Sequence, residues 1–317
     1  MSFLFYGNKP ALSFLQNTLA TGQIGHAYLF SGETGTGKST LARQFAKGIL
    51  CQDKTPPCEQ CSSCNKMQRS CHPDYTEIGP EPGKESFPVD AVRALITNAH
   101  IRPNESAYRV FLLKRAETML EEAANALLKL FEEPPAGVVL LLTCNHRANL
   151  LQTISSRCLS VDLFSVTDRE CREALERSCP KADRSLLDEA ALLGNGNIGR
   201  AIFYASDSIG QSVLSLSGKL EQALAQKNRL AFLQTIAPLE KNLPLFRAVL
   251  VALTERIRAA LMQRFFSRAS VLSALSQNYS IDAMIRMIRA IEDTEELISI
   301  HGNIRLTLCR FCVDLLE

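Results

Sequence analysis

A glycine-rich segment near the N-terminus constrains the fold of this chain more than any other feature. The pattern Gly32-x-x-x-x-Gly37-Lys38-Ser39 directly follows an apolar run and precedes a helical pattern. In this context it is typical of a phosphate-binding loop, whose backbone N–H groups converge on phosphates at the N-terminus of a helix. Lys38 is predicted to reach the β- and γ-phosphates, and Ser39 can ligate Mg²⁺. The predicted nucleotide-binding residues of this segment are Gly32, Gly35, Gly37, Lys38, Ser39 and Thr40.

The first half of the chain alternates short apolar runs, rich in β-forming residues, with helical patterns. This alternation predicts a parallel sheet that is wrapped by helices. We expect this nucleotide-binding α/β domain to cover residues 1–163. Its expected strands cover residues 26–31, 75–79, 108–114, 138–144 and 159–163.

The second half of the chain carries only helical patterns from about residue 164 onward. Gly194 ends one predicted helix and another begins at Asn197, which gives a compact three-helix domain over residues 164–206. Residues 207–317 are predicted to form amphipathic helices and a separate helical domain. The predicted fold class is therefore α/β followed by all-α.

The strand that should support nucleotide hydrolysis ends in the wrong residues. Phosphate-loop hydrolases need a carboxylate at the end of a nearby strand to hold Mg²⁺ and a second group that positions or activates water. Here the corresponding strand, Val110-Phe111-Leu112-Leu113, is followed by Lys114 and Arg115, whose positive charges oppose Mg²⁺ binding. Glu117 is expected to be a solvated charge at the start of a helix. The sequence predicts nucleotide binding without efficient hydrolysis.

A short polar, proline-containing segment holds a regular cysteine cluster. Thiols in such a segment have no apolar core to pack into, and the spacing is typical of a tetrahedral zinc site. Four thiolates close the coordination sphere, so we expect a structural zinc ion in a module over residues 51–71. Reduced free thiols and an iron–sulfur cluster are the alternatives. The predicted ligands are Cys51, Cys58, Cys61 and Cys64.

Charge and hydropathy limit where the chain works and what it contacts. The formal net charge is only +2 over 317 residues, so any contact with nucleic acid needs a local basic patch. No uncharged apolar stretch reaches the roughly 18 residues of a membrane span, and the N-terminus lacks a signal-peptide pattern. We expect a cytoplasmic protein that makes no membrane contact.

Ordered motifs along residues 1–205 resemble one known family. They are His26-Ala27-Tyr28-Leu29-Phe30 before the loop, the cysteine module after the loop's helix, His72-Pro73-Asp74, Ala123-Ala124-Asn125-Ala126-Leu127-Leu128-Lys129, Glu132-Glu133-Pro134-Pro135 and Ser156-Arg157-Cys158. Together they resemble the clamp-loader branch of AAA+ proteins, and within it the delta-prime family of bacterial DNA polymerase III.

The resemblance implies an accessory subunit that helps to load the sliding clamp onto primed DNA during replication. In this family the Ser-Arg-Cys motif supplies an arginine finger to the ATP of the adjacent subunit, which implies that role for Arg157. It also implies that Asn145 contacts nucleotide, that residues 164–206 form a lid domain and that residues 207–317 form a collar domain. The implied partners are gamma/tau motor subunits, the delta subunit, the sliding clamp and primed DNA.

Two other functions stay open at this point. A gamma/tau-like motor subunit would hydrolyse ATP by itself, against which Lys114 and Arg115 speak. A zinc-dependent nucleic-acid-binding module would bind DNA with an affinity that falls with salt and with zinc removal. The sequence also leaves open whether the loop holds ATP or ADP, and whether Mg²⁺ accompanies the nucleotide.

Overall fold

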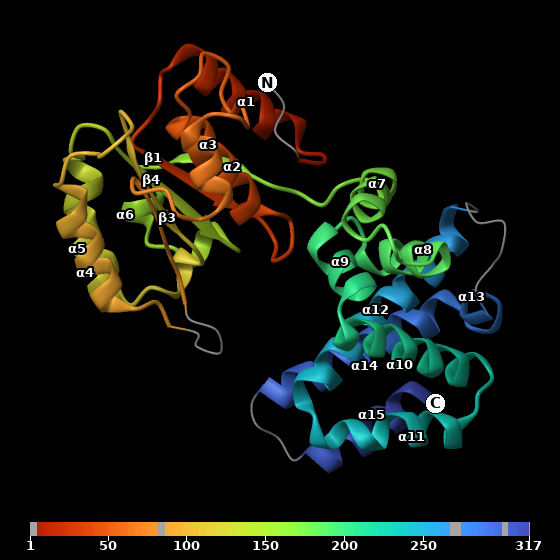
Figure 1. The fold of residues 1–317 in the computed structure, drawn as a ribbon. Coiled ribbons are helices and arrows are strands. Elements are labelled where there is room, and N and C mark those ends of the chain that lie inside the picture. The colour runs from red at the N-terminus through yellow and green to blue at the C-terminus, as the bar shows by residue number, and fades with distance from the viewer. Residues whose placement is uncertain (1–4, 81–85, 267–273, 300–303, 317) are drawn as a thin grey trace. The chain divides into compact units, whose positions relative to one another are not determined.

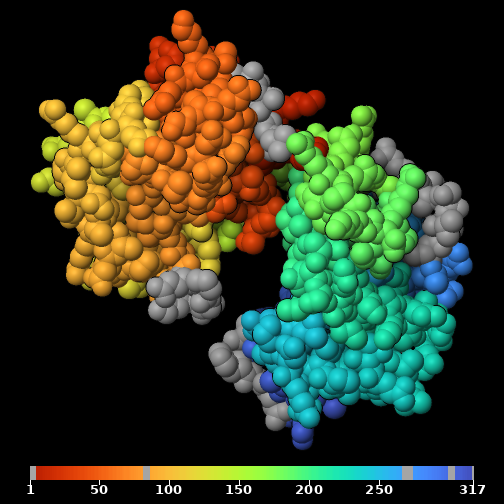
Figure 2. All heavy atoms as spheres, viewed as in Figure 1, coloured from red at the N-terminus to blue at the C-terminus, as the bar shows by residue number. Residues whose placement is uncertain are grey.

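The computed structural model describes residues 5–80, 86–266, 274–299 and 304–316. The chain divides into two compact units, residues 1–167 and 168–317, which Figure 1 colours from red to yellow-green and from green to blue. Figure 2 shows one face of the molecule, with its heavy atoms drawn as spheres. Within the described ranges, no helix is both long and apolar enough to cross a membrane.

The first unit contains a five-stranded sheet in the order β2-β3-β4-β1-β5, and every pair is parallel. Each predicted strand is present within one residue at either end. Because all strands run in one direction, the segments that follow them meet at one edge of the sheet. The strand bounds are β1 (Ala27–Ser31), β2 (Tyr75–Ile78), β3 (Arg109–Leu113), β4 (Val138–Cys144) and β5 (Leu159–Asp162).

Helices cover both faces of this sheet (Figure 1). Side chains of β1 alternate between the faces, so Leu29 packs in one core while Tyr28 and Phe30 pack in the other. Burial on both sides explains why the strands are almost continuously apolar in sequence. The core that contains Leu29 also includes residues of α4 (Val89–Ala99) and α5 (Glu121–Glu132). The core that contains Tyr28 and Phe30 includes residues of α1 (Lys9–Thr21) and α2 (Lys38–Leu50).

The helix α2 connects the two segments that the sequence singled out. It begins directly after Gly37, whose φ of 89° suits a glycine, and it ends at Leu50. Cys51 follows at once and opens the cysteine module, which contains α3 (Ser62–Gln68). The remaining short elements of this unit are η1 (Ala116–Thr118), η2 (Arg147–Asn149) and α6 (Gln152–Ser155).

In its described residues, the second unit consists of helices joined by short connecting segments and contains no strand. Arg256 of α12 donates hydrogen bonds to Ser217 and Glu221 of α10 and to Glu189 of α8, so these three helices share one partly buried ionic cluster. The predicted fold class, α/β followed by all-α, is confirmed, whereas the division of this unit into lid and collar domains stays a prediction. The helix bounds are α7 (Asp168–Ser178), α8 (Arg184–Gly194), α9 (Ile198–Ser206), α10 (Ser208–Ala225), α11 (Arg229–Ile236), η3 (Ala237–Lys241), α12 (Leu243–Phe266), α13 (Ala274–Asn278), α14 (Ile281–Ser299) and α15 (Ile304–Leu316).

Candidate nucleotide and metal sites

The phosphate loop lies between β1 and α2, where the sequence predicted it. Gly35 and Gly37 have φ angles of 92° and 89°, a region that glycine adopts without steric cost. A Cβ atom on Gly32 would lie 2.3 Å from the carbonyl oxygen of Leu163, so a side chain does not fit there. The loop leads into the first turn of a 13-residue helix, whose free N–H groups suit a phosphate.

Lys38 is the centre of the hydrogen bonds in this loop. Its Nζ donates to the carbonyl oxygens of Gly32 and Glu33, at 2.6 and 2.7 Å, and to Oδ1 of Asn145 at 3.0 Å. The Thr34 hydroxyl donates to the same Asn145 oxygen at 3.1 Å. Burial lowers the pKa of the Lys38 ammonium, while the nearby Glu117 carboxylate acts in the opposite direction.

The structure brings all predicted nucleotide-binding residues together. Asn145 follows β4, the neighbour of β1, and therefore reaches the loop at the shared edge of the sheet. Ser39 is half-buried and Thr40 is exposed, both in the first turn of α2 beside Lys38. The residues present fit a bound nucleotide phosphate.

Lys114 and Arg115, the two cations that follow β3, lie outside the hydrogen-bond network around Lys38. Lys114 forms an ion pair of 2.7 Å with Glu77 of β2, and Arg43 of α2 binds the same carboxylate through two hydrogen bonds. Hydrogen bonds from Arg43 and Lys114 hold the pKa of Glu77 at about 2, against the effect of burial. Arg115 is exposed and adopts a left-handed conformation with φ of 53°.

Glu117 corrects the sequence analysis, which expected a solvated charge. The residue lies in η1 and is partly buried. Its Oε1 accepts a hydrogen bond of 3.1 Å from the backbone N–H of Asn145, and its Oε2 is inaccessible to solvent. The left-handed Arg115 explains the difference, because it reverses the chain after β3 and returns Glu117 to the end of β4. The Glu117 carboxylate therefore lies beside the phosphate loop, contrary to the expectation from the sequence.

The four predicted metal ligands converge on one point. The Sγ atoms of Cys51, Cys58, Cys61 and Cys64 all lie within 4.8 Å of one another. Two of the sulfur pairs are 3.9 and 4.0 Å apart, and four sulfurs bound to one zinc ion at about 2.3 Å lie about 3.8 Å apart. The cluster could therefore hold a metal ion such as zinc.

Backbone donors point at these sulfurs. The N–H groups of Asp53, Cys61 and Cys64 donate to cysteine sulfurs at 3.3 to 3.5 Å. Such donors favour the thiolate form that binds metal. Burial raises the pKa of the Cys61 thiol, but backbone and thiol hydrogen bonds outweigh it and lower that pKa to about 6.

His72 follows the cluster but serves a different purpose. Its Nδ1 accepts the N–H of Asp74 at 3.1 Å, so its Nε2 carries the proton and donates to Ser63 Oγ at 2.6 Å. Ser63 in turn donates to the carbonyl oxygen of Leu50, the last residue of α2. This buried chain of hydrogen bonds ties the module to the end of the helix.

Arg157 lies apart from the loop, on the turn between α6 and β5. Its guanidinium donates to the carbonyl oxygen of Thr153 and to Oε1 of Glu132, both at 2.9 Å. The side chain is 37% exposed, whereas the next residue, Cys158, packs against the core of the sheet. A short turn therefore holds the Arg157 guanidinium, paired with Glu132, at the surface.

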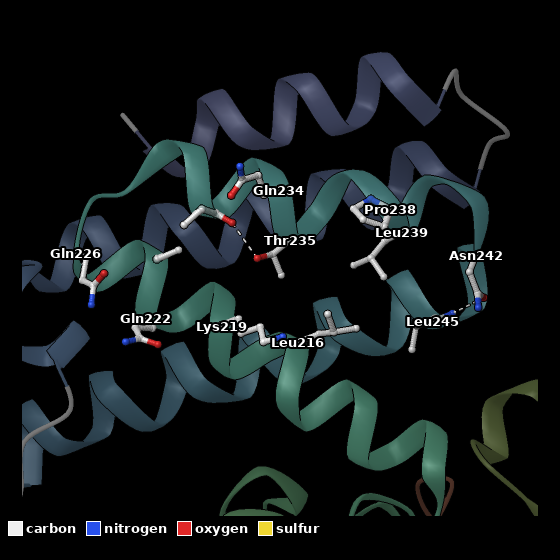
Figure 3. Close-up of a pocket in the computed structure, with 12 residues that line it drawn as sticks. Leu216, Lys219, Gln222, Gln226, Gln234, Thr235, Pro238, Leu239, Asn242 and Leu245 are labelled. Atoms are coloured by element: carbon white, nitrogen blue, oxygen red, sulfur yellow. Dashed lines mark hydrogen bonds between the residues drawn. The ribbon is translucent and has the colours of Figure 1, made fainter.

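A groove in the second unit offers no comparable chemistry. It has a cavity volume of about 720 Å³ and lies between α10, α11, η3 and the start of α12 (Figure 3). Lys219 is its one charged lining residue. The Thr235 hydroxyl donates to Ala231 in its own helix, and the Asn242 side chain accepts the N–H of Leu245. Thr235 and Asn242 thus serve local structure, and the described residues that line the groove include no acidic residue, histidine or cysteine.

Comparison with known families identifies the first unit. A family model described as DNA polymerase III, delta subunit, matches residues 7–167, just over half of the chain. The match includes the phosphate loop, the cysteine cluster and Arg157. The chain belongs to this family.

Several proteins are similar to this member of the DNA polymerase III delta subunit family. The delta-prime subunits of Pseudomonas aeruginosa and Yersinia pestis are 36% and 38% identical over 177 and 141 residues. Those alignments cover 55% and 44% of this chain, and 54% and 42% of the two subunits. The tau subunit of Salmonella typhimurium is 30% identical over 259 residues, which are 79% of this chain and 38% of tau. The chain thus spans about half or less of these relatives.

A solved structure aligns with this chain over almost the full length of both proteins. A gamma subunit-related protein of DNA polymerase III from Thermotoga maritima aligns with 95% of this chain and 98% of that chain. The TM-score is 0.47 and the sequence identity is 18%.

Proposed function

We propose that this chain is a delta-prime-type subunit of a bacterial DNA polymerase III clamp loader. In this role it acts in the cytoplasm with gamma/tau motor subunits and a delta subunit, and helps to place the sliding clamp on primed DNA during replication. Membership of the delta subunit family supports this assignment, as do the delta-prime relatives at 36% and 38% identity.

The observation that carries the proposal is the setting of Arg157. Its guanidinium is partly exposed on a short turn, and the adjoining Cys158 anchors that turn in the core. A guanidinium supplied in trans stabilises charge on the phosphoryl group in the transition state. Arg157 therefore acts as an arginine finger towards ATP bound by a neighbouring subunit.

The chain's own phosphate loop binds ATP or ADP without efficient turnover. No carboxylate stands directly after β3, where Lys114 pairs with Glu77 and Arg115 is exposed. These two positions therefore lack the acidic residue that in phosphate-loop hydrolases positions or activates water. The four-cysteine module binds a structural zinc ion, which leaves no ligand position for water or substrate.

The test is the ATPase activity of a reconstituted loader, stimulated by clamp and primed DNA. Wild type, Arg157→Ala and omission of the chain are compared, with the chain alone as a further sample. A finger is worth about 10³–10⁵ in rate at the site that it serves, so Arg157→Ala should silence the neighbouring site while assembly persists. Arg169→Ala is the matched control, because that arginine is also exposed and paired with one glutamate.

A gamma/tau-like motor ATPase is the second candidate. The complete phosphate loop favours it, as does the 30% identity to a tau subunit. Robust ATP turnover by the chain alone, together with no effect of Arg157→Ala in the loader, would establish the motor role and overturn the first proposal.

A further inference from the structure

Glu117 is connected to the phosphate loop through one residue. Its Oε1 accepts the backbone N–H of Asn145 at 3.1 Å. The side-chain oxygen of Asn145 accepts hydrogen bonds from Lys38 at 3.0 Å and from Thr34 at 3.1 Å. The carboxylate is also close enough to Lys38 for its charge to act on that ammonium. Glu117 therefore belongs to the nucleotide site and not to the solvated surface.

The second oxygen of this carboxylate lacks a partner. Oε2 of Glu117 is buried and has no hydrogen-bond partner among the described residues. Burying a carboxylate oxygen without a donor or cation is costly, so such an atom marks a place for a positive charge. Lys38 does not fill it here, because its ammonium already donates to three oxygens.

The neighbouring cations do not occupy this position either. Lys114 is paired with Glu77, which two hydrogen bonds from Arg43 also hold. Arg115 is exposed, and its backbone N–H donates to Thr143 Oγ1 at 3.0 Å. The Lys114 charge that the sequence analysis set against metal binding is therefore paired with Glu77, and the Arg115 residue is exposed to solvent.

We infer that Glu117 supplies the carboxylate that holds Mg²⁺ with a nucleotide bound in the phosphate loop. Mg²⁺ in nucleotide sites is commonly bound by one or two carboxylates together with phosphate oxygens. Glu117 then takes over the metal-binding task of the residue missing after β3, while the water-positioning group stays absent. The site retains magnesium nucleotide as a stable ligand. This inference rests on the proposed binding of nucleotide by the chain's own loop, and it does not rest on the role of Arg157.

A purely positioning role is the competing explanation. In that case Glu117 only fixes the backbone of Asn145, and its loss weakens nucleotide binding equally with and without metal. If Glu117 is a metal ligand, its loss removes only the part of the affinity that Mg²⁺ contributes. The positioning role and the metal-ligand role therefore differ in the ratio of the Kd of ATP without Mg²⁺ to the Kd of ATP with Mg²⁺.

The experiment measures the Kd of ATP for the full, zinc-loaded chain by calorimetry, in Mg²⁺ and in magnesium-free buffer that leaves zinc in place. Mg²⁺ should tighten wild-type binding by about tenfold or more, and Glu117→Gln should remove that gain while the Kd without Mg²⁺ stays within about twofold. Glu121→Gln, which changes an exposed carboxylate at the start of α5, should keep the full gain.

Three results overturn the inference. They are an unchanged magnesium gain in Glu117→Gln, an equal loss of affinity in both buffers, and a wild-type chain that binds no ATP. Each leaves the Arg157 proposal intact, because that proposal is read from turnover of ATP on another subunit. The electron paramagnetic resonance spectrum of Mn²⁺–ATP provides a second readout of direct coordination. It should broaden with the wild type and not with Glu117→Gln.

Discussion

Asp74 shows how a single buried carboxylate can organise two distant segments. Its oxygens accept the backbone N–H groups of Asn104, Glu105 and Ser106 at 2.6, 2.8 and 3.0 Å. Arg109 of β3 lies 3.5 Å away, and the Asp74 side chain is fully buried. Burial raises the pKa of Asp74, but the three backbone donors outweigh it and hold that pKa below its ordinary value.

Replacing Asp74 with Asn should lower the free energy of unfolding at pH 7 by roughly 3 kcal/mol, since it breaks a buried, hydrogen-bonded charge. Because the folded pKa is depressed, the stability from Asp74 is fully present above the ordinary pKa of about 3.9 and is lost as pH falls through the folded pKa. Urea unfolding between pH 7 and pH 3 measures both effects. The exposed Asp90→Asn variant is the control, and equal behaviour of the two variants would contradict this account.

The sequence predicted those site residues that belong to local patterns. The phosphate loop and the cysteine cluster are each complete within a short segment, so their spacing alone predicted that these residues lie together. Glu117 was missed because its position depends on the left-handed conformation of Arg115, which few residues other than glycine adopt. The partners of Asp74 lie about 30 residues away in sequence, and no local pattern indicates them.

At the scale of elements, the strands were predictable because burial on both faces makes them short apolar runs between turns. The order of the strands was not predictable in this way, since pairing depends on contacts between distant residues. The cysteine module depends on α2 for its placement. Ser63 bonds to the last carbonyl of that helix, and Lys47 pairs with Glu59 of the module.

Changing Cys61 to Ser should abolish stoichiometric zinc binding and lower the melting temperature by about 5 °C or more, since metal binding contributes directly to folding. Zinc content by mass spectrometry and thermal unfolding measure the two effects. Cys71→Ser is the matched control, because Cys71 is exposed and lies outside the cluster. Retention of one zinc ion by Cys61→Ser would refute the assignment of the ligands.

At the scale of the whole molecule, the candidate chemistry is confined to one unit. The predicted nucleotide-binding residues, the candidate metal ligands and Arg157 all precede Thr167, where the first unit ends. The sequence indicated the change from α/β to helical structure near residue 164. It carried no motif in residues 207–317 that specifies a task, because amphipathic patterns indicate only which side of a helix is buried.

The full chain should unfold in two calorimetric transitions, one for each unit. Mg²⁺ and ATP at about 100 times the Kd should stabilise only the first unit, by about 2.7 kcal/mol, because only that unit contains the loop. Differential scanning calorimetry measures both transitions, and a fragment of residues 168–317 identifies the second. A single transition that rises with nucleotide would show that the units unfold together.

The helix α2 is a spacer of fixed length and angle between the two candidate sites. Its 13 residues separate the phosphate loop from Cys51, which corresponds to about 20 Å at 1.5 Å per residue. Adding one residue would turn the cysteine module by about 100° around the helix axis relative to the loop. The length of this helix therefore sets both the distance and the orientation of the cysteine module relative to the phosphate loop.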